Sequence, residues 1–460
     1  MVPRFAQLVF RLYNFSMARI EPKLPTGFRD YLPAEARARE DILDKIKDQF
    51  RLAGFEPLET PGLEKEETLT GGDPDFKKQI FKAGLAGMKE DLALRFDLTV
   101  PLARVAALYP NELSRPFKRY QIGQVWRGER PQAGRFREFL QCDADIVGSL
   151  SVLADTDIVN LIYRVMKALG FRNFLIRVND RKVLNGLSSY AGFPAKNLPQ
   201  VLRAVDKLDK QGWNEVKKEL SSKEGGGLSA SAITAVKKFL DIEKGSRVER
   251  LAEARKLLGA SKEAAQGLDE LSDLARALAA VGVPDKNWTI DFSVARGLGY
   301  YTGPIFETIL PEAPKFGSVM SGGRYDGLIG RFGGNNVPAT GVSVGLDRLF
   351  AAMKELRMIK SSNGGSVIIL NFDSAATEAS LGLVSSIRDA GVPTELYLGT
   401  EKTLKGQLAY AVKKEYAVAV ILGEVELRQG VAQVKDLKAR SQKAVRLSEV
   451  PAFIQALLGK

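Results

Sequence analysis

Apolar residues recur at helical spacing near the start of the chain and then change to strand spacing. The segment 33–53 places apolar side chains along one helical face, at Ile42, Leu43, Ile46 and Phe50. Gly54 follows them and is a typical helix end. A strand is expected next, and it should end near Pro61, because proline restricts a strand to a sheet edge or a strand end.

The segment 126–148, WRGERPQAGRFREFLQCDADIVG, has the length of one β-hairpin. Gln141, Asp143 and Asp145 alternate along its second strand and should therefore share one face. Its arginines are Arg127, Arg130, Arg135 and Arg137. Because guanidinium groups grip phosphate oxygens bidentately, this mixture predicts a pocket for a polyphosphate nucleotide beside a small cationic or amine-bearing substrate. The alternative from the residues alone is a surface hairpin with solvated salt bridges.

The middle of the chain, from about residue 178 to 285, is rich in leucine, alanine and lysine and predicts a helical insertion. Helical spacing is clearest at Leu251, Ala254, Leu257 and Leu258. The segment WTIDFSV, residues 288–294, returns to a strand pattern, so a sheet is expected to resume there.

A linker-like segment, SSNGGS at residues 361–366, precedes a third region in which strand and helix patterns alternate. The strand patterns are VIILNFD, TELYL, VAVILG and VAQVKDL, and the helices lie before Gly391 and at 404–414. Short alternating units predict a three-layer α/β domain over 367–460, with a mostly parallel sheet and right-handed crossovers.

Composition narrows the function further. With 460 residues and 45% apolar content, the chain is long enough for two or three domains. Its formal charge of +12 favours a polyanionic partner such as nucleic acid. Cys142 is the single cysteine and there is no histidine, which excludes an internal disulfide, an ordinary zinc site and histidine-based acid–base catalysis. No apolar run approaches the roughly eighteen residues of a membrane span.

Residues 1–20 are treated as an N-terminal extension outside the fold. They contain Arg4, Arg11 and Arg19 and no acidic residue. This composition fits an organellar targeting segment, or else Met17 is the true start. The second interpretation is favoured, and with it a cytoplasmic location.

The hairpin segment resembles motif 2 of the class II aminoacyl-tRNA synthetases, in the form typical of histidyl-tRNA synthetases. Two signatures of that family also occur, RGLGYYTGPIFE at 296–307 and SGGRYDGLI at 321–329. Three further segments resemble its opening segment, its substrate-binding strand and helix, and class II motif 3: PTGFRDYLP at 25–33, LRFDLTVPLAR at 94–104 and GVSVGLDRL at 341–349. The resemblance covers nearly the whole chain from about Pro25.

The resemblance implies an α+β catalytic domain at 21–360, with an antiparallel class II sheet and the helical insertion at 178–285. It also implies a C-terminal α/β anticodon-binding domain at 367–460. The strand before Pro61 resembles motif 1, the dimer-interface element, so a homodimer is expected. The implied activity is that of a histidine–tRNA ligase, which forms histidyl-adenylate from L-histidine and ATP and then charges histidine tRNA. ATP would enter with Mg²⁺, and neither zinc nor an organic cofactor is expected.

The resemblance also implies residue roles. The catalytic residues would be Arg127 and Arg296. ATP would be bound by Arg127, Glu129, Arg135, Phe139 and Arg348. Histidine would be bound by Asp97, Thr99, Gln141, Asp145, Arg296, Tyr300, Tyr301 and Tyr325. The tRNA acceptor end would meet Arg130 and Gln132, and the insertion would offer its phosphates Lys207, Lys210, Lys217 and Lys218. No metal ligand from a protein side chain is implied.

Two positions depart from the family pattern: Gly299 replaces a common acidic residue, and Leu140 replaces a polar or aromatic one. The main alternative is a regulatory subunit of ATP phosphoribosyltransferase, which uses the same catalytic fold to sense histidine. Such proteins lack the C-terminal domain and usually lose the arginine set, whereas this chain keeps both. A noncatalytic synthetase-like protein would be expected to lack Arg127 or Arg296, and a glycine, threonine or proline enzyme would lack RGLGYYTG.

Overall fold

The computed structural model describes residues 20–71, 79–84, 87, 89–130, 134–242, 245–295, 300–333, 336–359 and 367–459. Contacts divide the chain into two compact units. The first unit runs to Met358 except for residues 31–38, which group with the C-terminal unit that starts at Ile359. Residues 1–19 of the predicted extension and the predicted linker lie outside the described residues. Within the described part of the chain, no helix is long and apolar enough to cross a membrane.

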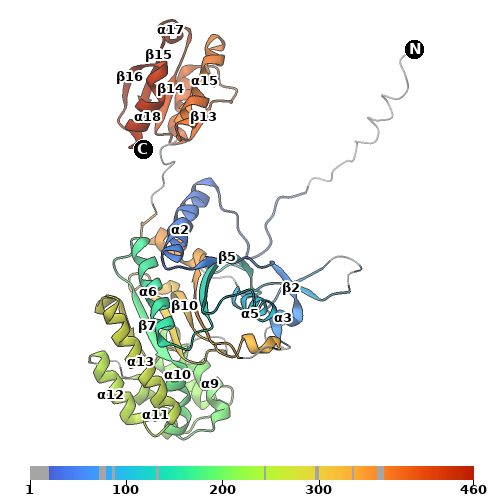
Figure 1. The fold of residues 1–460 in the computed structure, drawn as a ribbon, viewed down its shortest axis with the longest axis vertical. Helices are drawn as coiled ribbons and strands as arrows, with labels where there is room; N and C mark the ends of the chain where they lie inside the picture. Colours follow the sequence, from blue (N-terminus) through green and yellow to red (C-terminus); the bar gives the residue numbers. More distant parts are fainter. Residues whose placement is uncertain are drawn as a thin grey trace. The chain divides into compact units, whose positions relative to one another are not determined.

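An eight-stranded sheet forms the centre of the first unit (Figure 1). Its strand order is β1-β5-β6-β11-β10-β9-β7-β8. All the inner pairings are antiparallel, and only the edge pairs β1/β5 and β7/β8 are parallel. The strands are β1 (Glu56–Pro57), β5 (Phe117–Trp126), β6 (Glu138–Val147), β7 (Leu175–Asp180), β8 (Trp288–Ile290), β9 (Pro304–Ile309), β10 (Ser318–Arg324) and β11 (Ala339–Gly345). The predicted antiparallel sheet is confirmed.

Helices α2 (Pro33–Leu52), α6 (Val152–Ala168) and α14 (Leu346–Glu355) accompany this sheet. The apolar stripe of α2 is buried at Ile42, Ile46 and Phe50, as the sequence predicted, whereas Leu43 is only partly buried. Ser151 immediately precedes α6, and its hydroxyl caps the helix by accepting from the Leu153 backbone N–H at 3.2 Å.

A second, small sheet with the order β2-β4-β3 supports helix α5 (Thr99–Leu108). Its strands are β2 (Leu63–Lys65), β3 (Lys82–Ala83) and β4 (Leu92–Leu94), and α3 (Glu66–Thr70) follows β2. Asp97 lies just before α5, and its Oδ1 accepts from the Val100 backbone N–H at 3.1 Å. This contact holds the Asp97 carboxylate at the start of the helix.

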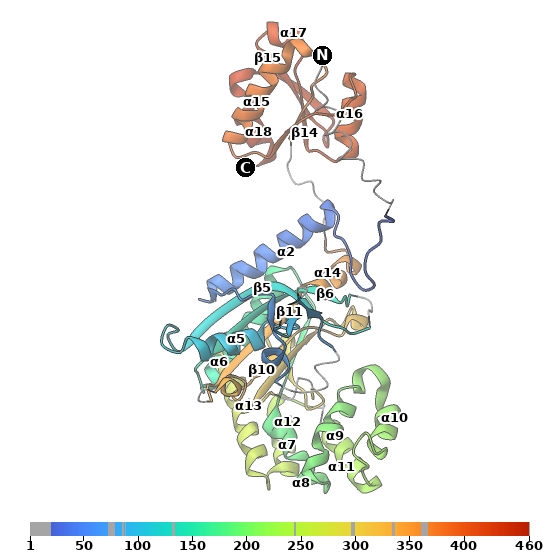
Figure 2. The ribbon, with the colours of Figure 1, turned by 90° about the vertical axis from the view of Figure 1, so that its right-hand side faces the viewer.

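Helices fill the chain between β7 and β8, where an insertion was expected. Val178 lies inside β7, so the helical segment begins only at Arg181 and its last helix ends at Ala280. Its α-helices are α7 (Arg181–Asn185), α8 (Leu187–Ala191), α9 (Leu198–Val205), α10 (Leu208–Ser221), α11 (Ala230–Leu240), α12 (Arg247–Leu258) and α13 (Lys262–Ala280). Figures 1 and 2 show them gathered at one end of the first unit. The strand expected across residues 288–294 is shorter than predicted, because β8 ends at Ile290.

The C-terminal unit contains a five-stranded sheet with the order β13-β12-β14-β15-β16. The prediction of a mostly parallel sheet is wrong: β12 pairs parallel with β13 and β14, but β14/β15 and β15/β16 are antiparallel. Its strands are β12 (Val367–Ile369), β13 (Thr394–Leu396), β14 (Val418–Ile421), β15 (Val431–Asp436) and β16 (Ser441–Arg446). Its helices are α15 (Thr377–Asp389), α16 (Leu404–Lys413), α17 (Glu424–Arg428) and α18 (Val450–Leu458).

Candidate active site

A cavity of about 490 Å³ lies in the first unit. It is lined by most of the residues that the sequence assigned to substrates: Asp97, Thr99, Arg127, Glu129, Arg135, Phe139, Gln141, Asp145, Tyr300, Tyr301, Tyr325 and Arg348. Arg296, Gln132 and Gly299 lie outside the described residues. Arg130 is exposed and does not line the cavity.

The hairpin formed by β5 and β6 carries the polar row of the cavity. β6 alternates so that Gln141, Asp143 and Asp145 line the cavity, as the period of a strand requires. β11 pairs beside β6 with Gly341 opposite Asp145. A Cβ at Gly341 would lie 1.9 Å from the Asp145 Oδ1, so only glycine lets the carboxylate occupy this position.

The carboxylates of Asp97, Asp143 and Asp145 are all buried in this region. Burial raises the pKa of Asp97 to about 6 and that of Asp143 to about 7, although Arg119 lowers both. Burial also raises the pKa of Asp145. Asp97 Oδ2 and Asp143 Oδ2 are buried and accept no hydrogen bond from the described residues. Buried acceptors without donors suit a ligand that brings its own N–H groups.

Arg119 and Tyr325 fix the Asp145 carboxylate from two directions. The fully buried Arg119 places Nη2 2.8 Å from Asp145 Oδ2, and Tyr325 donates its hydroxyl to Asp145 Oδ1 at 2.5 Å. Tyr300 packs against both Tyr301 and Tyr325, with ring centroids 4.9 and 5.8 Å apart. Burial raises the pKa of all three tyrosines, so their hydroxyls stay protonated and can donate hydrogen bonds.

Arg127 supplies a forked cation at the same cavity. Its Nε donates to the Phe96 carbonyl at 2.9 Å and its Nη2 donates to Gln141 Oε1 at 3.3 Å. Its guanidinium lies 5.1 Å from the centroid of the Phe139 ring. These contacts hold the guanidinium in place before any substrate arrives, which lowers the cost of binding an anion.

Arg135 and Arg348 line the cavity from different segments. Arg348 Nη1 donates to the Ser318 carbonyl at 2.5 Å, and Arg135 Nη1 lies 3.8 Å from Glu129 Oε2. The neighbouring Asp347 anchors α14, because it accepts from the Leu140 backbone N–H at 2.9 Å and pairs with the buried Arg39. Leu140 therefore contributes through its backbone.

Several cavity residues were not assigned to this site by the sequence. Asp143 was placed on the correct face but given no role, and Ser343, Asp206 and Asp347 were not singled out. Lys210, which was expected to contact tRNA phosphates, also lines the cavity. Of the other lysines proposed for that contact, Lys207 pairs with Glu219 at 2.6 Å and Lys218 pairs with Glu215 at 2.6 Å. Asp206 and Lys210 reach the cavity only through the packing of the helical segment, for which the sequence pattern carries no signal.

Comparison with known families agrees with this geometry. The family model described as "Histidyl-tRNA synthetase" matches residues 27–349. A second model, described as "Anticodon binding domain", matches residues 366–457. The C-terminal unit is therefore an anticodon-binding domain.

Curated relatives and solved structures extend the match over the chain. The histidine–tRNA ligase of Paracoccus denitrificans is 42% identical over 447 residues, covering 91% of this chain and 90% of the relative. That of Gloeobacter violaceus is 42% identical, covering 94% and 98%. The crystal structure of histidyl-tRNA synthetase from a Nostoc species has a TM-score of 0.84 and 32% identity, covering 95% of this chain and all of that one. The chain therefore belongs to the histidyl-tRNA synthetase family.

Proposed function

We propose that this chain is a histidine–tRNA ligase that activates L-histidine with ATP and then transfers it to the 3′ end of histidine tRNA. The observation that carries the proposal is one cavity lined both by buried carboxylates and by Arg127, Arg135 and Arg348. Carboxylates suit the ammonium and imidazole N–H groups of histidine, and arginines suit phosphates.

The first step joins two anions, so neutralising charge is the main task. The histidine carboxylate attacks the α-phosphorus of ATP, a new C–O–P bond forms, and pyrophosphate leaves with the electron pair of the broken P–O bond. Arg127 and Arg296 would hold the α-phosphate and the attacking carboxylate, and Arg135 and Arg348 would lie nearer the γ-phosphate. Such fixed cations stabilise charge that develops in the transition state.

Adenine recognition is assigned to Phe139 and Glu129. The Arg127 guanidinium lies over the Phe139 ring, so the adenine would stack on the opposite face. The Glu129 carboxylate would accept from the adenine amino group. ATP would enter as its magnesium complex, and the metal would neutralise phosphate oxygens that the arginines do not reach.

Histidine selection follows from paired hydrogen bonds in a buried site. Asp97, Thr99 and Gln141 would surround the amino group, and Asp145 and Tyr301 would read the imidazole. Tyr300 and Tyr325 would close the pocket, since Tyr325 donates its hydroxyl to Asp145 and Tyr300 packs against the Tyr325 ring. A site built to pair with polar groups rejects ligands that lack them by about 10⁴ or more, because its own buried groups would be left unpaired.

In the second step the ribose hydroxyl at the 3′ end of the tRNA attacks the histidyl carbonyl, and AMP leaves. Arg130 is suited to meet the acceptor end, because it is exposed beside the cavity residue Glu129. Gln132 is assigned to the same contact. The proposal includes a homodimer built at the edge strand β1 and a cytoplasmic location.

The experiment is charging of histidine tRNA with radiolabelled histidine, with Arg296→Ala as the inactive control. ATP-dependent, ribonuclease-sensitive incorporation that is lost in the control would support the proposal. Histidine binding without incorporation, at any enzyme concentration, would overturn it and favour a histidine-sensing regulatory protein. Adding a zinc chelator should leave incorporation unchanged, and removing magnesium should abolish it.

A further inference from the structure

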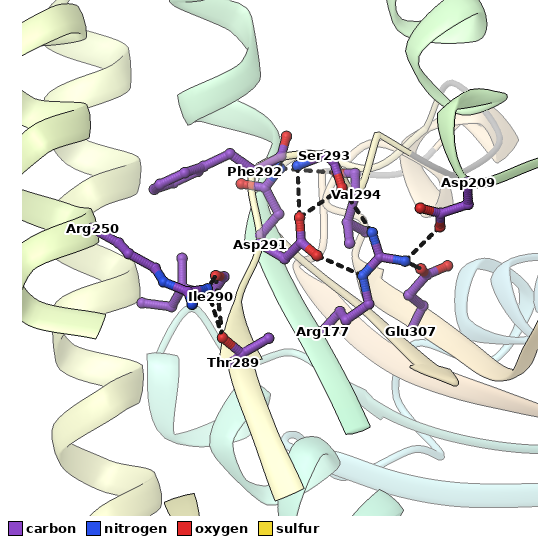
Figure 3. Close-up of polar contacts among 11 residues, drawn as sticks. Arg177, Asp209, Arg250, Thr289, Ile290, Asp291, Phe292, Ser293, Val294 and Glu307 are labelled. Carbon is purple, nitrogen blue, oxygen red and sulfur yellow. Dashed lines mark hydrogen bonds and ion pairs between the residues drawn. The ribbon is translucent and has the colours of Figure 1, made fainter. Parts of the chain in front are cut away.

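A buried arginine joins three separate segments behind the candidate active site. Arg177 lies on β7 among the polar contacts drawn in Figure 3. It is nearly buried, because only 7% of its side chain is exposed. Its Nη1 donates to Glu307 Oε1 on β9 at 2.8 Å. Its Nε donates to Asp291 Oδ2 at 2.6 Å, and its Nη2 donates to Ser293 Oγ at 2.7 Å. Both of these partners lie just after β8.

Hydrogen bonds hold the segment after β8 at every position from Asp291 to Val294. Asp291 Oδ1 accepts from the Ser293 backbone N–H at 2.9 Å and from its hydroxyl at 2.6 Å. Asn179 Nδ2 donates to the carbonyls of Phe292 and Val294 at 3.2 and 2.9 Å. Val294 lines the cavity and lies two positions before Arg296 in the sequence. The Arg177 contacts therefore hold the segment 291–294, which brings Val294 to the cavity lining.

The fourth partner of Arg177 comes from the helical segment. Asp209, in the first turn of α10, accepts from Arg177 Nη1 at 2.5 Å (Figure 3). Asp206 and Lys210, its neighbours in the sequence, line the cavity. The contact that seats α10 on the sheet thus also sets one part of the cavity lining.

The charges in this cluster make the contacts strong and interdependent. Burial alone would lower the pKa of Arg177. The carboxylates of Asp291, Glu307 and Asp209 outweigh burial and raise the pKa above its ordinary value, so the guanidinium stays charged. Removing Arg177 would strand buried carboxylates and would destabilise the fold for reasons unrelated to function. Asp209 is a better residue to substitute, because its side chain is 48% exposed and its replacement leaves Arg177 paired with Asp291 and Glu307.

We propose that Arg177 and Asp209 are positioning residues that couple the packing of the helical segment to the position of the segment 291–294, which carries the cavity residue Val294. Neither residue needs to touch a substrate. Asp209 holds α10 against Arg177, and Arg177 holds the segment 291–294. Release of Asp209 would leave Arg177 with fewer partners and would loosen the parts of the cavity lining that Asp206, Lys210 and Val294 form. The inference rests on the proposed function.

The test is Asp209→Asn in the full-length protein, measured by histidine-dependent ATP–pyrophosphate exchange. Because a displaced cavity lining misaligns the reacting groups more than it weakens histidine binding, kcat should fall about tenfold while the KM for histidine changes less than about threefold. Asp209→Glu keeps the charge and should restore most of the lost kcat. A purely stabilising ion pair would instead lower the melting temperature without this split between kcat and KM.

Arg250→Gln provides the matched control. Arg250, on α12, also ties the helical segment to the sheet, since its Nη1 donates to Thr289 Oγ1 and to the Ile290 carbonyl, both at 2.9 Å (Figure 3). Within the described residues, its hydrogen bonds reach Gly245, Thr289 and Ile290 but not the segment 291–294, so kcat should stay within about twofold of the wild type.

Hydrogen–deuterium exchange gives a second readout that does not depend on activity. Backbone amides of 291–295 should exchange faster in Asp209→Asn than in Arg250→Gln. The inference is overturned if Asp209→Asn keeps the wild-type kcat and exchange pattern, or if Arg250→Gln lowers kcat equally. If the wild-type protein shows no histidine-dependent activity, the proposed function fails together with this inference; a normal wild type beside a normal Asp209→Asn variant refutes this inference alone.

Discussion

The buried position of Asp143 disfavours the ionised form of its carboxyl group. Burial raises its pKa to about 7, so the folded protein binds a proton there that the unfolded chain has already released. The free energy of unfolding should therefore fall as the pH rises from about 4 toward 7, since the unfolded carboxyl has a pKa near 3.9. The ionised Asp143 carboxylate therefore lowers stability at neutral pH, which favours a role in ligand binding over a structural role.

The first prediction concerns Asp143→Asn. Histidine affinity of the wild type should rise as the pH increases through 6 to 7, because Asp97 and Asp143 become able to hold an ammonium group. The variant should bind histidine about tenfold more weakly at pH 8 through loss of a charge-assisted hydrogen bond. It should also melt at a higher temperature at that pH. Calorimetric titration and thermal melts at pH 5.5 and 8 check both effects.

The imidazole of the substrate titrates in the same way whether it is mixed with the wild type or with Asp143→Asn. The difference between the two pH profiles of histidine affinity therefore reports the contribution of Asp143. Equal affinities at pH 8, or a variant that melts at a lower temperature there, would contradict this role.

The second prediction concerns Arg127→Lys. Lysine keeps the charge but cannot contact the Phe96 carbonyl and Gln141 with a planar fork, as Arg127 does. kcat for adenylate formation should fall about 10²-fold, a typical loss for one fixed donor in a transition state. Arg130→Lys is the matched control, because Arg130 is exposed and outside the cavity lining; its pyrophosphate exchange should be unchanged. A variant of Arg127 with wild-type kcat would exclude the proposed role.

At this scale the family motifs predicted most of the residues that line the cavity, and the alternation along β6 independently predicted which of its side chains share a face. Gln141 and Asp145 share a face for the simple reason that a strand alternates. Asp206 and Lys210 could not be found in this way. They reach the cavity from a helical segment whose packing depends on distant contacts such as that between Arg177 and Asp209.

At the scale of elements, the close pairing of β6 and β11 determines the position of Asp145 in the proposed histidine pocket. Gly341→Ala would place a Cβ 1.9 Å from the Asp145 Oδ1 and would push the carboxylate out of reach of Arg119 and Tyr325. The KM for histidine should rise about tenfold or more, because the paired acceptor is lost from a buried site. Gly327→Ala is the control, since its Cβ meets nothing within 4 Å. Steady-state exchange kinetics compare the two, and equal KM values would contradict this account.

The sequence predicted most elements and misjudged the C-terminal sheet. β16 is exposed at every position except Val445, so it lacks the apolar alternation that marks a half-buried strand. Without β16, the β15/β16 hairpin could not be recognised, and the alternation of strands and helices before it suggested a mostly parallel sheet. Edge strands of this kind are specified by pairing, which a local pattern does not reveal.

At the scale of the whole molecule, the formal charge of +12 bears on tRNA binding rather than on the chemistry of activation. Raising the salt concentration from about 50 to 200 mM should raise the KM for tRNA about tenfold or more, because released counterions drive phosphate contacts. The KM for histidine in pyrophosphate exchange should change much less, since its contacts are buried. Parallel charging and exchange assays check this, and equal salt dependence would contradict it.

The most direct measurement is ATP–pyrophosphate exchange by the purified protein without tRNA, tested with each of the twenty amino acids. The account predicts exchange with histidine alone, abolished in Arg296→Ala. Exchange with a different amino acid, or none with any amino acid despite measurable histidine binding, would contradict it.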